Sequence, residues 1–188
     1  SAHAKMRRVF RFAYEAIHQD LVQESVSIAV QVTRKGRVGV ARTDTLTPQS
    51  LRRCAAAAMD IAAHAPERDT LPALPKHHRL VTRRDAAAAT SRLSAAEAVG
   101  SLKRLFQICR GAGASLAGSF VTGEDEFAVA NSAGTVCYAA STVSGAKLVT
   151  MFGACSGYAS GVHRDIRRLG LDTLLKRSLA QSLHRKEP

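Results

Sequence analysis

The sequence SVSIAVQVTRKGRVGVAR, residues Ser25 to Arg42, predicts a β-hairpin from which the rest of the fold can be worked out. Lys35 and Gly36 provide a tight turn between its halves, because glycine tolerates a positive φ. Apolar β-branched residues alternate strictly with small or polar ones before the turn, as in a strand that buries one face. These alternating residues are Val26, Ile28, Val30 and Val32.

Three helices are predicted outside this hairpin. Thr47 and Pro48 are a favourable N-cap and first helical residue for a helix that ends before Pro66. Ser94 and Glu97 form a capping box for a second helix, which we expect to end in a left-handed Gly111. Its predicted buried face consists of Ala98, Leu102, Leu105, Phe106 and Cys109. The third helix runs from Leu171 to about Leu183.

The segment between the second and third helices predicts an antiparallel meander of short strands. SLAGSFVT, EFAVAN, TVCYAAST and AKLVTMFG are separated by GED, SAG and SG, which are turn compositions. Upstream, the stretch from Met6 to Val22 fits either a helix or strands on periodicity alone.

These elements predict an α+β fold, with an antiparallel sheet packed against about three helices in two layers. We expect one domain over residues 1–188, with hairpins and the first helix in 1–75 and a linker over 76–93. Residues 94–188 then hold the second helix, the meander and the last helix.

Composition indicates a soluble cytoplasmic protein. No apolar run approaches the ~20 residues of a membrane span, and the start does not resemble a signal peptide. The four cysteines are widely scattered, so we interpret them as small buried residues in a reducing compartment. The net charge of +12 leaves nucleic-acid binding open. Its basic residues cluster at Lys5, Arg7, Arg8 and Arg11; at Arg34, Lys35 and Arg37; at Lys76, Arg79, Arg83 and Arg84; and at Arg164, Arg167 and Arg168.

No complete catalytic or metal-binding constellation is found in the sequence, so we assign no catalytic and no metal-ligating residue. His77 and His78 are adjacent and flanked by basic residues, which disfavours a cation site. We expect His163 to serve a turn or helix cap and His18 to be a hydrogen-bonded residue of the sheet.

Several stretches together resemble the N-terminal part of the TldD/PmbA family, zinc metallopeptidases of peptide maturation also described as modulators of DNA gyrase. The matching stretches, in order, are RFAYEAIHQ (Arg11 to Gln19), GRVGVARTDTLTPQSL (Gly36 to Leu51), APERDTLPALP, FAVANSAGTVCYAAST, SGY (Ser156 to Tyr158) and LGLDTLLKRSLAQSL.

The resemblance implies that RRVFRFA and IHQDLV are two strands of a sheet. It also implies a structural or peptide-path role for the positions that match the family's motifs. These positions are Arg11, Phe12, Ala13, Ile17, His18, Gln19, Asn131, Gly134 and Gly157.

Active members of that family carry an H-E-x-x-x-H zinc motif beyond the matched region, and this chain has no HE dipeptide. The resemblance therefore implies a non-catalytic piece of a longer protein, or a relative reduced to that piece. Zinc is expected only if a downstream catalytic domain exists.

Three functions follow as hypotheses. In the first, the chain is the scaffold or substrate-channel domain of a TldD/PmbA-like metallopeptidase, with peptides or unfolded proteins as substrates and a related subunit as its homo- or heterodimeric partner. In the second, it is a non-catalytic partner subunit or interaction module of such an assembly. In the third, it is a basic protein associated with nucleic acid.

Overall fold

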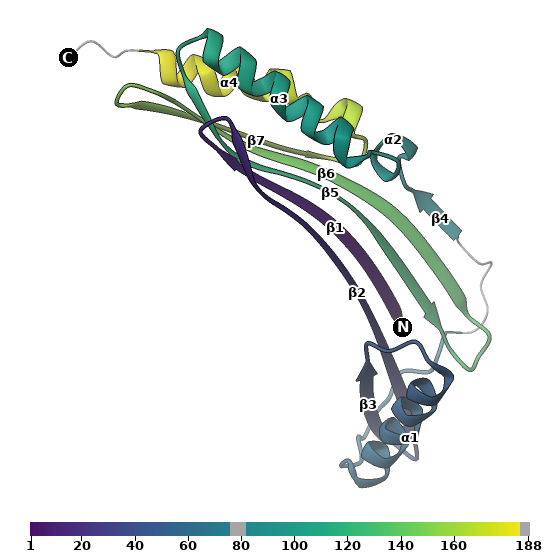
Figure 1. Ribbon diagram of the computed structural model, residues 1–188. Helices are drawn as coiled ribbons and strands as arrows, with labels where there is room; N and C mark the ends of the chain where they lie inside the picture. Colours follow the sequence, from purple (N-terminus) through teal and green to yellow (C-terminus); the bar gives the residue numbers. More distant parts are fainter. Residues whose placement is uncertain (76–81, 185–188) are drawn as a thin grey trace. The chain divides into compact units, whose positions relative to one another are not determined.

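The computed structural model describes residues 1–75 and 82–184, and it confirms the α+β class with an antiparallel sheet (Figure 1). Seven strands form one sheet in the order β3-β2-β1-β5-β6-β4, and β7 also pairs with β6. The strands are β1 (Ala2–Ala13), β2 (Ala16–Arg34), β3 (Arg37–Thr43), β4 (Thr82–Asp85), β5 (Ser115–Ala130), β6 (Val136–Phe152) and β7 (Cys155–His163). The helices are α1 (Pro48–His64), α2 (Ala88–Ser91), α3 (Ala95–Gly111) and α4 (Leu171–Leu183), with a 3-10 turn at Ile166–Arg168.

The chain divides into two compact units, and the long strands contribute to both. Unit 1 comprises Ser1–Lys5, Glu24–Arg84 and Asp125–Ala140, and unit 2 comprises Met6–Gln23, Asp85–Glu124 and Ser141–Pro188. The single domain over 1–188 stays a prediction. Within the expected linker over 76–93, the described residues form β4 and the one-turn helix α2. His77 and His78 lie outside the described residues.

Unit 1 contains the predicted hairpin of β2 and β3. The strands pair antiparallel in the register Arg34↔Arg37 to Ile28↔Thr43, and both turn residues, Lys35 and Gly36, have positive φ. Helix α1 begins at the predicted cap, since the Thr47 side chain accepts the backbone N–H of Ser50. Its buried residues are Cys54, Ala58 and Ala62, whereas Met59 is 54% exposed.

Unit 2 holds the main hydrophobic core, where α3 and α4 cover one face of the sheet (Figure 1). Phe10 of β1 stacks on Phe120 of β5, and Phe12 meets Phe106 of α3 edge-on. The capping box of Ser94 and Glu97 is present. The predicted buried face of α3 is confirmed in full, as Ala98, Leu102, Leu105, Phe106 and Cys109 are all buried. The last helix also has the predicted bounds.

The ambiguous N-terminal stretch forms strands, as the family resemblance implied. Strands β1 and β2 are joined by Tyr14 and Glu15, and both of these residues have positive φ, 49° and 58°. Such a pair of left-handed residues is the geometry of a two-residue hairpin turn with the twist that antiparallel strands need. The helical alternative for this stretch is therefore wrong.

Two predicted turns are wrong, because β5 and β6 are each one long strand rather than two short ones. Glu124, Asp125 and Glu126 lie inside β5, and Gly145 lies inside β6. The turn at Asn131 to Gly134 is confirmed between these strands. The predicted left-handed end of α3 is also displaced, since Gly111 is still helical and Gly113 has the positive φ of 68°.

Candidate functional site

The family-motif residues of β1 serve its packing and its hairpin. Phe12 is buried in the core of unit 2, while Arg11 on the same strand is exposed. The carbonyl oxygen of Ala13 is 3.0 Å from Nε2 of His18, which gives that ring a backbone partner. The residues of this motif therefore lie on both strands of the hairpin formed by β1 and β2.

The motif residues of β2 differ in burial along the strand. Ile17 packs against the core, whereas His18 and Gln19 are exposed. Arg11, His18 and Gln19 are therefore the members of this motif with side chains available to a ligand.

Asn131 fixes the hairpin that joins β5 and β6. Its Oδ1 accepts the backbone N–H groups of Ala133 and Thr135, both at 3.0 Å, and Gly134 has a positive φ of 90°. Its Nδ2 donates to the carbonyl oxygen of Pro75 at 2.9 Å, and the Thr135 hydroxyl donates to the same oxygen at 2.7 Å. The hairpin therefore anchors the proline-rich connection that follows α1.

Gly157 lets α4 lie directly on β7. A Cβ at this position would overlap the carbonyl oxygen of Ser178. The Ser178 hydroxyl donates to the carbonyl oxygen of Gly157 at 2.9 Å and lies 2.9 Å from the Thr150 hydroxyl. Ser182 completes this buried hydroxyl cluster, since the Thr150 hydroxyl donates to it. The glycine of the SGY motif is thus a packing residue.

His163 has a local structural role, as expected. Its Nδ1 accepts the backbone N–H of Asp165 at 2.9 Å, in a turn that leads to the short 3-10 helix. Asp165 caps that helix by accepting the backbone N–H of Arg167. The Arg167 guanidinium also hydrogen-bonds this carboxylate and lowers the pKa of Asp165 to about 2. The side chains of His163 and Asp165 are therefore both held by hydrogen bonds within this turn.

No group of three His, Cys, Asp or Glu side chains that could hold a metal ion occurs within residues 1–75 and 82–184. Zinc needs about three protein ligands in a catalytic site. The described residues of this chain therefore do not fit zinc, and no chemical step is assigned to it here. No described helix is long and apolar enough to cross a membrane.

Several arginines of two basic clusters noted in the sequence are hydrogen-bonded or ion-paired within unit 2. Arg8 hydrogen-bonds the Asp20 carboxylate, with its Nε 2.8 Å from Oδ1, and this partner raises the pKa of Arg8. Arg7 donates to the carbonyl oxygen of Glu124 at 3.0 Å. Arg164 pairs with Asp85 and Arg167 with Asp165. These arginines are therefore less available to a polyanion than their number suggests.

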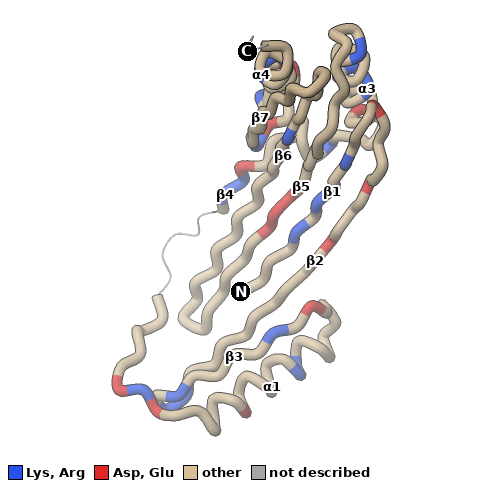
Figure 2. The backbone as a smooth tube through the Cα atoms, turned by 90° about the vertical axis from the view of Figure 1, so that its left-hand side faces the viewer, with Lys and Arg blue, Asp and Glu red and all other residues tan. Residues whose placement is uncertain are grey.

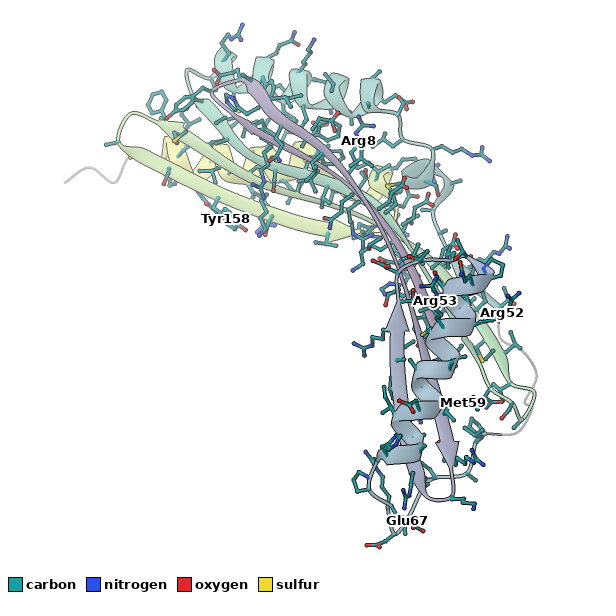
Figure 3. The ribbon with its side chains drawn as sticks, turned by 60° about the horizontal axis from the view of Figure 1, so that its bottom comes forward. Arg8, Arg52, Arg53, Met59, Glu67 and Tyr158 are labelled. Atoms are coloured by element: carbon teal, nitrogen blue, oxygen red, sulfur yellow. The ribbon has the colours of Figure 1, made fainter. Side chains whose placement is uncertain are left out.

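Unit 1 has a groove between the outer edge of β3 and the neighbouring side of α1. A cavity of about 280 Å³ there is lined by Ala41, Arg42, Thr43, Ser50, Arg53, Cys54 and Ala57. A second cavity of about 330 Å³ lies at the other end of β3 and is lined by Arg34, Lys35, Arg37, Ala62, Ala63 and Glu67. We call the first cavity and the adjoining edge the β3–α1 groove. Figure 3 shows Arg53 on the side of α1 toward the end of β3 and Arg52 on the other side.

Among the strands of residues 1–75 and 82–184, β3 lies at an edge of the sheet, since β2 is its only neighbour in the strand order. No side chain of the described residues hydrogen-bonds the backbone of β3. The β7 edge is different, because Gln181 of α4 accepts the backbone N–H of Tyr158 at 2.8 Å. An unpaired strand edge can pair with another extended chain. Among these two edges, β3 is the one without such a side-chain cover.

Comparison with known proteins gives likenesses of structure only. No family model and no curated protein matches the sequence. TldE from Thermococcus kodakarensis has the same fold, with a TM-score of 0.76 and 15% identity over 95% of this chain. Two proteins described as candidate modulators of DNA gyrase are also similar. The one from Thermotoga maritima has a TM-score of 0.70 and 13% identity over 100% of this chain, and the one from Bacteroides thetaiotaomicron has 0.72 and 16% over 97%.

The chain spans less than half of each of these proteins, namely 42%, 45% and 44% of their lengths. At these identities the likeness establishes the fold, and it does not assign an activity.

Proposed function

We propose that this chain is the scaffold and substrate-channel domain of a TldD/PmbA-like metallopeptidase that matures peptides, and that it does not itself carry the zinc motif. The observation that supports this most is the fold likeness, which covers at least 95% of this chain and at most 45% of each similar protein. A domain shared in this way is compatible with a structural scaffold, with the catalytic residues in another part of the longer protein.

The described residues suit binding better than bond cleavage. In the turn after β7, the His163 ring is hydrogen-bonded to the backbone and the Asp165 carboxylate is hydrogen-bonded to an arginine. The β3 edge, in contrast, offers a free backbone, and backbone pairing recognises an extended chain with little demand on its sequence. The proposed role is therefore to hold an unfolded or peptide substrate for a catalytic domain, in an assembly with a related subunit.

The test uses the full-length native protein purified with any co-purifying subunit. We expect an intact mass well above that of 188 residues, about one bound zinc per catalytic subunit, and cleavage of an unfolded protein such as reduced casein that stops with a zinc chelator. A zinc-loaded assembly without detectable cleavage would overturn the peptidase proposal.

A second proposal, the non-catalytic partner subunit, is motivated by the absence of an HE dipeptide in the sequence. It predicts a native protein without zinc and without an H-E-x-x-x-H helix anywhere in its reading frame. In that case cleavage activity should appear only when the related subunit is added. Zinc bound by the native protein alone would contradict it.

A further inference from the structure

We propose that the β3–α1 groove binds an extended acidic peptide segment, which adds to the sheet as a strand beside β3. The inference rests on the proposed function and deepens it, because it names the sheet edge and the charge of the substrate segment. Three features of unit 1 lead to it: the direction of the free backbone groups of β3, the small side chains on the facing side of α1, and two arginines without a carboxylate partner.

The register of the hairpin determines which backbone groups of β3 face outward. Ala29 exchanges both of its backbone hydrogen bonds with Ser1, at 2.9 and 2.8 Å, on the side of β2 away from β3. Its partner on β3 is Arg42, so Ala29↔Arg42 is a pair without mutual hydrogen bonds. The N–H and C=O groups of Val38, Val40 and Arg42 must therefore point away from β2, where an added strand could pair with them.

Helix α1 provides one wall of the groove. Gly39 allows the helix to approach closely, because a Cβ at Gly39 would overlap the carbonyl oxygen of Ala58. The helical residues that line the groove are Ser50, Arg53, Cys54 and Ala57. Apart from Arg53 these side chains are small, which leaves room for alternate side chains of an added strand.

The other face of β3 is suited to apolar side chains. Val40 is 43% exposed and lies one residue from Gly39, so it points to the face opposite α1. Cross-strand pairs of β-branched residues stabilise antiparallel sheets. On β2 the partner of Val40 is Gln31, so an added strand with valine on this face would give Val40 an apolar cross-strand partner.

The charge of the groove favours an acidic occupant. Arg53 of α1 and Arg42 of the β3 edge line the cavity, and no described carboxylate pairs with either of them. Because side chains alternate along a strand, the Arg42 side chain lies with Val40 on the face opposite α1, and Arg53 is the cation on the α1 side. Figure 2 shows Lys and Arg positions in blue on β3 and α1. Asp44, just after β3, is hydrogen-bonded by the Thr45 hydroxyl. A carboxylate facing α1 would gain a charge-assisted hydrogen bond from Arg53.

The experiment measures binding of fluorescein-labelled EVEVEVE to the 188-residue chain by anisotropy, with KVKVKVK as the control peptide. We expect EVEVEVE to bind and KVKVKVK not to bind. Arg53→Glu should weaken EVEVEVE binding at least about tenfold, whereas Arg52→Glu, the same charge change on the other side of α1, should leave it near the wild-type value. The binding should weaken with rising salt.

A backbone variant tests the strand pairing directly. Val40→Pro removes an outward N–H that has no partner within the sheet, so the hairpin should fold and EVEVEVE binding should be lost. Circular dichroism of each variant checks the fold. If Val40→Pro does not fold, the comparison of Arg53→Glu with Arg52→Glu still decides the question.

Four outcomes would overturn the inference, and a fifth would overturn only the peptidase proposal. Equal losses in Arg52→Glu and Arg53→Glu would indicate diffuse attraction by net charge, as would competition by duplex DNA that is unaffected by Arg53→Glu. A dimer of the wild-type chain that Val40→Pro dissociates would make a second copy the occupant. If EVEVEVE does not bind while the full-length assembly cleaves casein, the groove assignment fails alone. If EVEVEVE binds as described and the assembly does not cleave, the peptidase proposal fails alone.

Discussion

Gly157 of β7 and Ser178 of α4 meet without an intervening side chain, because a Cβ on Gly157 would overlap the Ser178 carbonyl oxygen. Gly39 of β3 has the same relationship to Ala58 of α1. In each unit, a helix thus packs on a strand at a glycine. The hydroxyl of Ser178 strengthens the contact in unit 2 by bonding the backbone on both sides, at Gly157 O and Thr150 N.

Replacing these contact glycines should destabilise the protein far more than replacing a glycine elsewhere. Gly157→Ala forces α4 away from β7 and should lower the free energy of unfolding by about 3 kcal/mol. Gly100→Ala is the matched control, because Gly100 lies inside α3 with nothing within 4 Å of its added Cβ. It should raise the free energy of unfolding by about 0.5–1 kcal/mol. Urea unfolding followed by circular dichroism measures both, and a neutral Gly157→Ala would contradict the close contact.

Local signals were enough to predict much of this fold. The caps at Thr47 and Ser94 depend on hydrogen bonds within three residues, and both were identified correctly from the sequence. The turn at Lys35 and Gly36 is equally local, since it requires only positive φ at two adjacent residues. Caps and turns that depend only on neighbouring residues could therefore be predicted from the sequence.

The errors arose where a distant strand overrides a local turn signal. Gly123 to Glu126 has a turn composition, yet β5 continues through it beside β1, where Arg7 donates to Glu124 O. A Cβ on Gly123 would overlap the carbonyl oxygen of Met6, so this glycine serves the approach of β1. At Gly145 the space is less restricted, because an added Cβ would lie 3.2 Å from a side-chain carbon of Val121 and 3.5 Å from one of Val162.

The β3–α1 groove could not be predicted as a site for the same reason. The hairpin of β2 and β3 was evident, but the position of β3 at the edge of the sheet depends on the order of all seven strands. The separation of Arg52 from Arg53 also needs the placement of α1 on β3. Their adjacency in the sequence gives no indication of which one faces the groove.

The four cysteines should differ sharply in reactivity, contrary to the sequence interpretation of four buried thiols. Cys54 and Cys109 are buried, but Cys137 is exposed and Cys155 half-buried. Burial, with a smaller contribution from Glu15, raises the pKa of Cys109 to about 11. Because the thiolate is the reactive form, DTNB should modify Cys137 first and Cys109 only on unfolding. Loss of the fast phase in Cys137→Ser would check the assignment, and a fast phase that persists would contradict it.

Asn131 should be more important for the segment from Pro66 to Pro75 than for the strands it joins. Asn131→Ala removes the bond to Pro75 O and both acceptor contacts of the turn, and should cost about 1–2 kcal/mol. Limited proteolysis should then cut the segment from Pro66 to Pro75 faster. Ser132→Ala, at the exposed neighbouring position, is the control and should match the wild type. Equal cleavage of both variants would show that the proline-rich connection is held by other contacts.

The Asp165 carboxylate should make the free energy of unfolding depend on pH in the acidic range. Hydrogen bonds from Arg167 lower its pKa in the folded protein to about 2, from an ordinary value of 3.8. A lowered folded pKa means that the ionised form stabilises folding fully above the unfolded pKa and that this contribution is lost as pH falls from about 4 toward 2. The stability difference between the wild type and Asp165→Asn, measured by urea unfolding, should therefore be constant above about pH 5 and shrink below pH 4. Arg167→Gln should remove most of that pH dependence while it leaves Asp165 in place. A difference that does not change between pH 5 and pH 3 would show that the Asp165 carboxylate gains nothing from its arginine in the folded state.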